Sequence, residues 1–127
     1  MEQAATGALR KVFARDPEIL SWALSDVEMM SALSRLEREE AVSPEGFRDA
    51  CASVELLWEG VTVVSLVEGV KVRARRVLRM HPLRAADACQ LGAALLAVYD
   101  DPGGWEFVCL DERLRQAALR EGFALLP

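Results

Sequence analysis

The sequence predicts an α/β fold in which helices cover both faces of a mostly parallel sheet. Short apolar or β-branched segments alternate along the chain with single helices or pairs of helices, and this alternation is typical of parallel sheets. A chain of 127 residues suits a single domain with one core, and no linker, repeat or low-complexity segment divides residues 1–127. In such sheets, ligands bind beyond the carboxyl ends of the strands.

Hydrophobic periodicity sets the expected elements. We expect helices over residues 3–14, 26–40, 44–58, 67–80, 83–98 and 111–122, and strands over residues 18–24, 61–66, 106–110 and 123–127. The helical segments carry apolar residues at helical spacing. The strand segments are short and either continuously apolar or rich in β-branched residues, which favour extended backbone.

Breakers and caps set the boundaries in the first half of the chain. Asp16 and Pro17 end the first helix, because the residue before a proline resists the helical region. Ser25 or Asp26 is expected to cap the second helix, since a short polar side chain there accepts a hydrogen bond from a free backbone N–H. Pro44 occupies the first helical position of the third helix, where its missing N–H does no harm.

The boundaries in the second half follow from the same chemistry. Gly60 ends the third helix and a β-branched strand follows it. His81 and Pro82 break the chain between the fourth and fifth helices, and His81 is expected to serve as a cap or turn residue. The turn-rich segment 100–105 forms a loop, and Gly122 closes the last helix.

Composition favours a protein that is neither secreted nor embedded in a membrane. Apolar residues make up 52% of the chain, yet no run of about 18 or more predicts a transmembrane helix. The N-terminus shows no pattern of basic and then apolar residues that would indicate a secretion signal. The net charge of −5 does not favour nucleic-acid binding, although a local basic patch or a bound metal can offset it.

The three cysteines indicate a reducing compartment. Cys51, Cys89 and Cys109 are widely spaced and form no CxxC pair, so the sequence predicts neither a zinc site nor a disulfide framework. Cys89 and Cys109 lie in apolar stretches, where we expect them to be buried as small apolar side chains. This usage of cysteine fits a cytoplasmic protein.

Acidic residues follow the expected strands or open the helices beside them. Glu28 comes shortly after the first strand, Asp111 follows the third strand, and Asp87 opens a helix that is otherwise almost free of charge. Converging carboxylates repel one another unless a hard cation such as Mg²⁺ or Mn²⁺ binds between them. Acids in the first turn of a helix also interact favourably with its dipole, and for Asp26 a capping role is the better interpretation.

The apolar helix carries a sequence motif around its acid. The pattern R-x-x-D-x-x-[HQ]-L-A is matched by Arg84, Asp87, Gln90 and Leu91, with Gly92 in place of the usual alanine. This stretch resembles the PIN-domain family, specifically its VapC-like toxins. The resemblance therefore offers an explanation for Asp87 at the start of an apolar helix, namely that it is the acid position of this motif.

Two further stretches carry the same resemblance. The family's F-V-T-x-D-x-x-L strand and helix start is matched over residues 107–114, with Cys109 in the threonine position. Upstream, residues 21–40 are similar to the family's second-strand segment, in which a glutamate follows Ser or Thr by three residues, as Glu28 follows Ser25. The resemblance covers nearly the whole chain and is strongest after residue 80.

The resemblance implies a metal-dependent endoribonuclease. In that family, a cluster of acids holds Mg²⁺ or Mn²⁺, and water activated at the site attacks the RNA phosphodiester. Carried over by motif, the catalytic and metal-binding residues are Glu28, Asp87 and Asp111. The resemblance further implies a toxin that is held by an antitoxin protein, and it makes a homodimer the expected assembly.

The chain departs from the family at its start. PIN domains open with a central strand ending in D-x-[ST]-[AV], which supplies an aspartate, and no such motif precedes Asp16. We therefore expect a PIN-like α/β/α sandwich without its first strand. Three interpretations stay open: a misassigned or shortened start, a degenerate domain that binds without cutting, or replacement of the ligand by Asp26. The last is disfavoured because Asp26 points about 200° around the helix from Glu28.

Four arginines lie close together in the expected helix 67–80. Arg73, Arg75, Arg76 and Arg79 span about two turns, and they form either a solvated face or contacts to RNA phosphates, which arginine binds in bidentate fashion. For the ribonuclease hypothesis, the candidate RNA contacts are Arg73, Arg76 and Arg84.

The competing hypothesis is a non-catalytic interaction module. A sheet without its central strand exposes strand edges or apolar surface. A second copy of the chain or an antitoxin-like partner would cover that surface. This hypothesis predicts a stable dimer formed through the N-terminal half of the chain.

Overall fold

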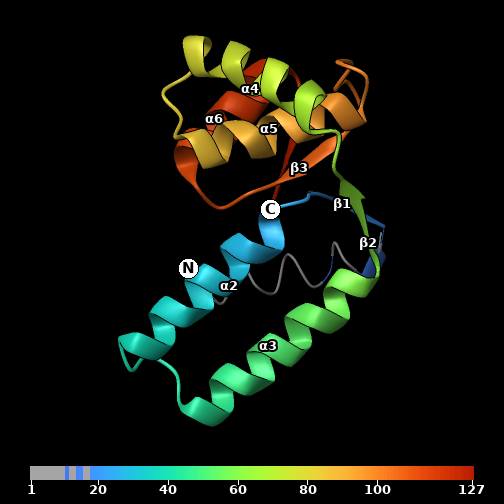
Figure 1. Cartoon of the computed structure of the whole chain (residues 1–127). Helices are drawn as coiled ribbons and strands as arrows, with labels where there is room; N and C mark the ends of the chain where they lie inside the picture. The colour runs from blue at the N-terminus through green and yellow to red at the C-terminus, as the bar shows by residue number, and fades with distance from the viewer. Residues whose placement is uncertain (1–10, 12–13, 16–17) are drawn as a thin grey trace.

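The computed structural model describes residues 11, 14–15 and 18–127 and has a mixed α/β architecture (Figure 1). Its helices are α2 (Ser25–Arg38), α3 (Pro44–Glu59), α4 (Val67–Met80), α5 (Ala85–Ala97) and α6 (Glu112–Glu121). Its strands are β1 (Ile19–Trp22), β2 (Val61–Val64), β3 (Glu106–Val108) and β4 (Ala124–Leu126). The helix expected over residues 3–14 falls almost entirely outside the described residues.

The other five expected helices are confirmed to within two residues at each end. The expected start of the third helix at Pro44 and the expected end of the last helix at Gly122 are confirmed as well. The Ser43 hydroxyl accepts a hydrogen bond of 3.0 Å from the Gly46 N–H ahead of Pro44, and Gly122 ends α6 with a left-handed φ of 113°. The four strands are all present but are shorter than expected, at three or four residues each.

The expected cap of α2 is wrong. Leu24 occupies the N-cap position, and no side chain caps the helix. Ser25 and Asp26 already lie inside the first turn, where the Asp26 carboxylate accepts a hydrogen bond of 2.7 Å from the Val27 N–H. The loop from β1 to α2 is so short that the helix begins before a polar side chain can take the cap position.

The strands form two parallel pairs rather than one sheet. β1 pairs with β2 from Ile19↔Val61 to Trp22↔Val64, and β3 pairs with β4 from Glu106↔Ala124 to Val108↔Leu126. The prediction of parallel pairing is confirmed, but the prediction of one continuous sheet is wrong for the part of the chain that the structure describes. The physical reason is that no described strand lies between β1 and β3 to join the two pairs.

The core surrounds α5. Leu91 and Leu95 of α5 are buried together with Val77 of α4, Leu114 of α6 and Phe123, which directly precedes β4. Burial of these side chains supplies the largest favourable contribution to folding in this half of the molecule. Figure 1 shows α5 between α4 and the β3 region, so α5 has neighbours on several sides.

Gly92 lets α4 and α5 approach closely. A Cβ atom at this position would lie 2.9 Å from the Val70 carbonyl oxygen and 3.1 Å from the Ala74 nitrogen. Both atoms belong to the backbone of α4, so they cannot move aside as a flexible side chain could. The glycine in place of the usual alanine in the motif is therefore the residue that this helix contact requires.

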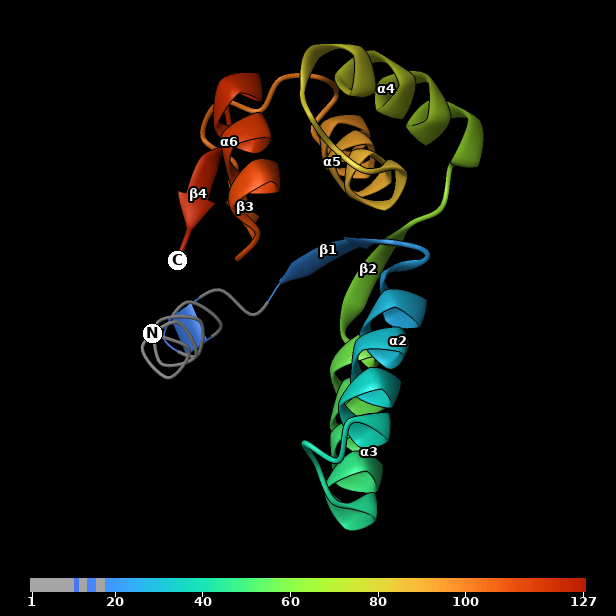
Figure 2. The ribbon, with the colours of Figure 1, turned by 90° about the vertical axis from the view of Figure 1, so that its left-hand side faces the viewer.

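The hairpin of α2 and α3 projects from the rest of the molecule (Figure 2). The two helices contact each other, with Cys51 Sγ 3.8 Å from Met30 Sδ. Neither helix contains a fully buried residue. Large apolar side chains stay exposed on both, including Val27 at 61% and Leu56 at 71%.

Candidate functional site

The three predicted acids all lie beside the carboxyl ends of β1 and β3. Glu28 is in the first turn of α2, which follows β1, and Asp111 follows β3 as the N-cap of α6. Asp87 is in the first turn of α5. The structure therefore brings all three to the region where a parallel α/β fold usually binds its ligand.

Asp87 and Asp111 interact electrostatically. Burial raises the pKa of the half-buried Asp87 carboxyl, the nearby charge of Asp111 raises it further, and Arg84 acts in the opposite direction. The thiol of Cys109, in the motif position usually held by threonine, also has a raised pKa, mainly because of its burial. Asp87 is therefore partly desolvated and also lies within the electrostatic influence of the exposed Asp111 carboxylate.

Glu28 is hydrogen-bonded to the N-terminal half of α5, which also carries Asp87. Its Oε2 atom accepts a hydrogen bond of 2.6 Å from Gln90 Nε2. The negative charge of Glu28 contributes, after burial, to the raised pKa of the neighbouring Cys89 thiol. This bond fixes the position of Glu28 relative to α5 and gives Gln90 of the sequence motif a structural role.

The three predicted acids do not form a metal-binding group in the part of the chain that the structure describes. Among residues 18–127 and the few described before them, no group of three or more His, Cys, Asp or Glu side chains is arranged to hold a metal ion. The charge of Asp111 acts on Asp87, whereas Glu28 is hydrogen-bonded to Gln90. Asp111 also caps α6 by accepting a hydrogen bond of 3.0 Å from the Leu114 N–H.

Cys89 and Cys109 are half-buried rather than fully buried as expected. Both lie at the edge of the apolar clusters. Cys109 Sγ is 3.6 Å from the Asp111 carbonyl oxygen, which accepts its S–H. The expectation of full burial, drawn from apolar neighbours in sequence, is therefore wrong for both thiols.

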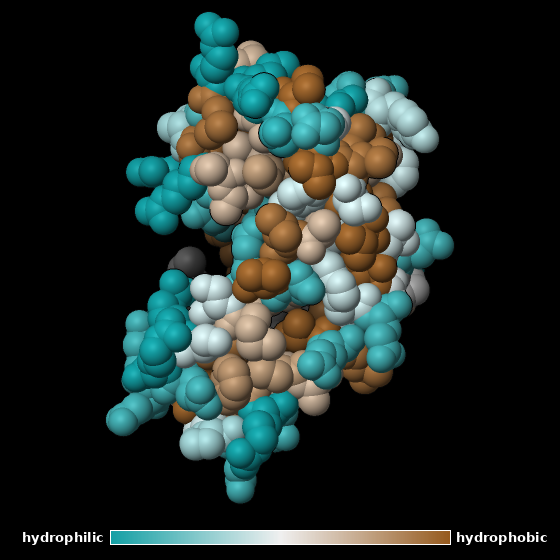
Figure 3. All heavy atoms as spheres, in the orientation of Figure 1, coloured by the Kyte–Doolittle hydropathy of each residue, from teal (hydrophilic) through white to brown (hydrophobic). Residues whose placement is uncertain are grey.

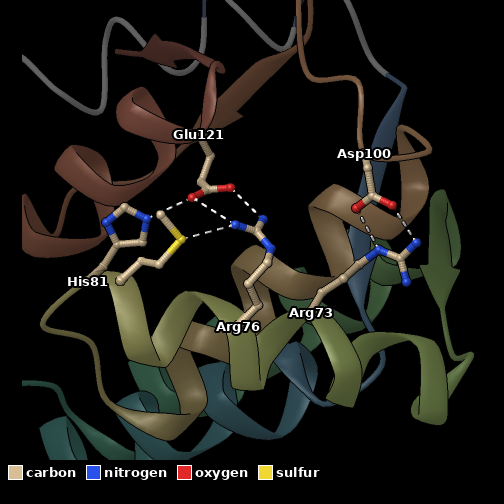
Figure 4. A network of polar contacts seen from close by, with 6 residues as sticks. Arg73, Arg76, His81, Asp100 and Glu121 are labelled. Atoms are coloured by element: carbon tan, nitrogen blue, oxygen red, sulfur yellow. Dashed lines mark hydrogen bonds and ion pairs between the residues drawn. The ribbon is translucent and has the colours of Figure 1, made fainter.

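Two of the three candidate RNA contacts form ion pairs within the chain (Figure 4). The Arg73 guanidinium donates two hydrogen bonds, of 2.8 and 2.7 Å, to the Asp100 carboxylate. Arg76 donates to Glu121 at 2.5 and 3.4 Å. Arg84 is exposed and lies close enough to Asp87 to lower its pKa, so it is the candidate that lies beside the acids.

Glu121 lies between Arg76 and His81 and was not anticipated from the sequence (Figure 4). His81 Nε2 and Glu121 Oε2 are 2.8 Å apart, and their side chains are 5% and 9% exposed. Burial alone would raise the pKa of Glu121, but the hydrogen bonds from Arg76 and His81 outweigh it and lower the pKa. His81 is the C-cap residue of α4, as expected, but it is also buried, with no hydrogen-bond partner for Nδ1.

A groove of about 830 Å³ separates the two strand pairs. Residues 18–22 form one wall, β3 with its neighbours forms the other, and α5 forms the floor. The floor residues are Gln90, Ala93, Ala94, Ala97 and Val98. Figures 1 and 2 place β1 and β3 beside each other below α5, and Figure 3 shows apolar residues reaching the surface across the middle of one face.

Comparison of the chain with family models, curated proteins and solved structures returns no match. No helix within the described ranges combines the length and apolar character needed to cross a membrane. The resemblance to PIN domains therefore depends on the sequence motifs, and the activity that it implies enters below as a proposal.

Proposed function

We propose that the chain is a PIN-like endoribonuclease of the VapC-like toxin type that depends on Mg²⁺ or Mn²⁺. The observation that carries the proposal is the position of the two acids: Asp87 lies in the first turn of α5, Asp111 follows β3 as the N-cap of α6, and the charge of Asp111 adds to burial in raising the pKa of Asp87. Proteins commonly hold Mg²⁺ with one or two carboxylates together with water and substrate phosphates. The carboxylate pair suits such a cation, and the motifs around both residues support the same activity.

The roles of the surrounding residues follow from their positions. Asp87 and Asp111 would hold the cation, which when bound neutralises phosphate charge and makes water a better nucleophile. Glu28 is oriented by Gln90 on the same half of α5 and would complete the acidic site when that hydrogen bond opens. Arg84 lies beside Asp87 and would bind an RNA phosphate at the edge of the site.

Cleavage of a fluorescent RNA in Mn²⁺ tests this function. The Asp87→Asn and Asp111→Asn variants are expected to lose most of the activity, as is the wild type in EDTA. Asn caps helices as well as Asp does, so Asp111→Asn keeps the α6 cap while it removes the charge. Asp49→Asn, an exposed acid on α3, is the matched control, and cleavage that survives EDTA or Asp87→Asn would contradict the proposal.

The second candidate is a non-catalytic interaction module that forms a homodimer or binds an antitoxin-like partner. The observation that favours it is the α2–α3 hairpin, which contains no buried residue and leaves Val27 and Leu56 largely exposed. Exposed apolar surface of this kind marks many protein–protein contacts. Sedimentation is expected to give a dimer that Leu56→Lys dissociates, and a strictly monomeric wild type would argue against self-association.

A further inference from the structure

The outer face of α4 carries an open hollow of about 570 Å³, lined by Arg75, Arg76, Arg79 and Met80. All four residues are exposed, whereas the other side of α4 is buried and contacts α5. Three arginines in one hollow make this face basic, although the chain as a whole has a net charge of −5. A local patch of this kind attracts an anionic partner in spite of the net charge.

Arg76 forms the fixed wall of this hollow. Its guanidinium donates hydrogen bonds of 2.5 and 3.4 Å to the two carboxylate oxygens of Glu121 (Figure 4). The Glu121 side chain is nearly buried and belongs to the last turn of α6, so it holds the guanidinium in one place. Its negative charge also compensates the charge of Arg76. Arg76 therefore shapes the hollow and contributes little free charge to it.

Arg75 and Arg79 supply the free positive charge. Neither forms a hydrogen bond or an ion pair with any residue in the part of the chain that the structure describes. They are four residues apart on one face of the helix, which is about 6 Å along its axis. A guanidinium binds a phosphate through two parallel hydrogen bonds. The pair therefore suits two successive phosphates of one strand.

The lining favours a phosphate backbone over a protein partner. Among the described residues, Met80 is the one apolar side chain in the lining, and no aromatic ring belongs to it. Protein partners bind mainly through buried aromatic or aliphatic anchors, for which this hollow has no matching pocket. A phosphate backbone requires only well-placed cations. Without aromatic rings on which bases stack, the contact is independent of base sequence.

Charge also argues against the chain itself as the occupant. Residues 1–17, most of which lie outside the described ranges, contain three basic and two acidic side chains, so they have no excess of negative charge to bring to a basic hollow. A second copy carries 20 acidic but also 15 basic residues. A nucleic-acid strand, in contrast, carries a negative charge at every phosphate.

The hollow lies at the end of α4 that leads to the candidate site. Residues 81–84 connect Met80 to α5, and Figure 1 shows the end of α4 and the start of α5 on the same side of the molecule. Arg84, the last residue of this connection, is exposed and lowers the pKa of Asp87. A strand that crosses the hollow can therefore continue past Arg84 towards the acids.

We infer that Arg75 and Arg79, with Arg76 as the fixed wall, bind the phosphate backbone of a single-stranded RNA outside the candidate site. The choice of RNA rests on the proposed function, but binding at this hollow requires neither a metal nor cleavage. Because the arginines contact phosphates alone, the hollow holds the strand without reading its bases or its 2′-hydroxyl groups.

Fluorescence anisotropy in buffer with EDTA tests this binding separately from the ribonuclease activity. The probe is a fluorescein-labelled oligouridylate of about twelve nucleotides, a length within the usual range for single-strand sites. An oligothymidylate of the same length is expected to bind within about twofold of it, since the hollow contacts only phosphates. Loss of cleavage in Mn²⁺ with intact binding in EDTA would count against the ribonuclease and not against the hollow.

Variants of the chain locate the contact. Arg75→Gln combined with Arg79→Gln is expected to weaken binding about tenfold at low salt. The slope of log K against log salt should become shallower by about 1.4, since each lost phosphate contact removes about 0.7. Arg75→Lys combined with Arg79→Lys keeps the charge without the planar fork, so it should keep the slope and lose about threefold in affinity.

A matched control removes the same charge elsewhere. Arg35→Gln combined with Arg38→Gln alters two exposed arginines in the last turn of α2, which belongs to the hairpin that projects away from α4 (Figure 2). This variant should bind the probe like the wild type. An equal loss in the control would mean that only the net charge matters, and that result would overturn the assignment of the hollow.

Four further outcomes would also overturn it. They are failure of the folded wild type to bind the probe, unchanged affinity and salt slope when Arg75 and Arg79 are both Gln, displacement of the probe by hexaglutamate as readily as by unlabelled RNA, and self-association at low salt that the same double variant abolishes. Displacement by hexaglutamate would indicate an acidic protein segment as the occupant. Self-association of that kind, measured by sedimentation, would identify a second copy.

Discussion

Gln90 Nε2 donates a hydrogen bond of 2.6 Å to Glu28 Oε2, and this bond joins α5 to α2 beside the end of β1. Both side chains are half-buried. The bond therefore stabilises a carboxylate at the candidate site, and it connects the projecting helical hairpin to the main core.

The first prediction concerns this bond. Gln90→Leu leaves the Glu28 carboxylate without its partner and is expected to lower the free energy of unfolding by about 1–2 kcal/mol, as measured by urea denaturation. Gln116→Leu is the matched control, because Gln116 donates a 2.9 Å hydrogen bond to Glu112 at an exposed position of α6. Equal effects of the two substitutions would show that the Glu28–Gln90 bond has no special structural role.

The second prediction concerns Glu121. Glu121→Gln weakens its hydrogen bonds with Arg76 and His81, so we expect a loss of about 1–2 kcal/mol of stability at pH 7. The lowered pKa of Glu121 stabilises the fold above the ordinary value near 4.5, and this contribution is lost as the pH falls below that value through the folded-state pKa.

Unfolding curves at several pH values check the second prediction. The difference between wild type and Glu121→Gln should shrink as the pH falls below about 4.5. Glu112→Gln is the control, since the Glu112 side chain is 74% exposed. A constant difference across that pH range would mean that the charge of Glu121 is not what stabilises the network.

The third prediction concerns the contact of α4 with α5. Gly92→Ala places a Cβ against the Val70 carbonyl oxygen and is expected to destabilise the fold by about 1–3 kcal/mol. Gly69→Ala places a Cβ against the flexible side chain of Leu96, and the better helix propensity of alanine should make it neutral or stabilising. Thermal unfolding of both variants separates the two cases, and a stabilising Gly92→Ala would contradict this reading of the helix contact.

The fourth prediction concerns Asp87 in the absence of metal. Its raised pKa means that the folded state disfavours the ionised carboxylate, so Asp87→Asn is expected to stabilise the fold by about 0.5 kcal/mol at pH 7. The gain should shrink in acid, as the pH falls through the raised pKa and the wild-type carboxyl becomes protonated. Chemical denaturation in EDTA measures this difference, and a destabilised Asp87→Asn would show that Asp87 makes a favourable contact instead.

Local signals in the sequence predicted the elements well. The helix expected over residues 67–80 coincides with α4, Pro44 starts α3 as expected, and Gly122 ends α6 as expected. These features depend on residues close in sequence. The cap of α2 was missed because the connection from β1 fixes where that helix begins.

Contacts between distant residues were not predictable in the same way. His81 and Glu121 are forty residues apart in sequence, and nothing in the local pattern of either one indicates the other. The acids of the candidate site were identified from motifs, but only the structure shows that Glu28 is hydrogen-bonded to Gln90 and that the charge of Asp111 acts on Asp87. The strands form two separate pairs because of which strands lie next to each other. The residue pattern within each strand does not carry that information.

The most direct measurement is titration calorimetry of Mn²⁺ into the wild type, Asp87→Asn and the control Asp49→Asn. If Asp87 and Asp111 hold a divalent cation, the wild type and Asp49→Asn will bind Mn²⁺ with the same affinity, and Asp87→Asn will lose that binding. Identical isotherms for the wild type and Asp87→Asn would contradict the assignment of this site.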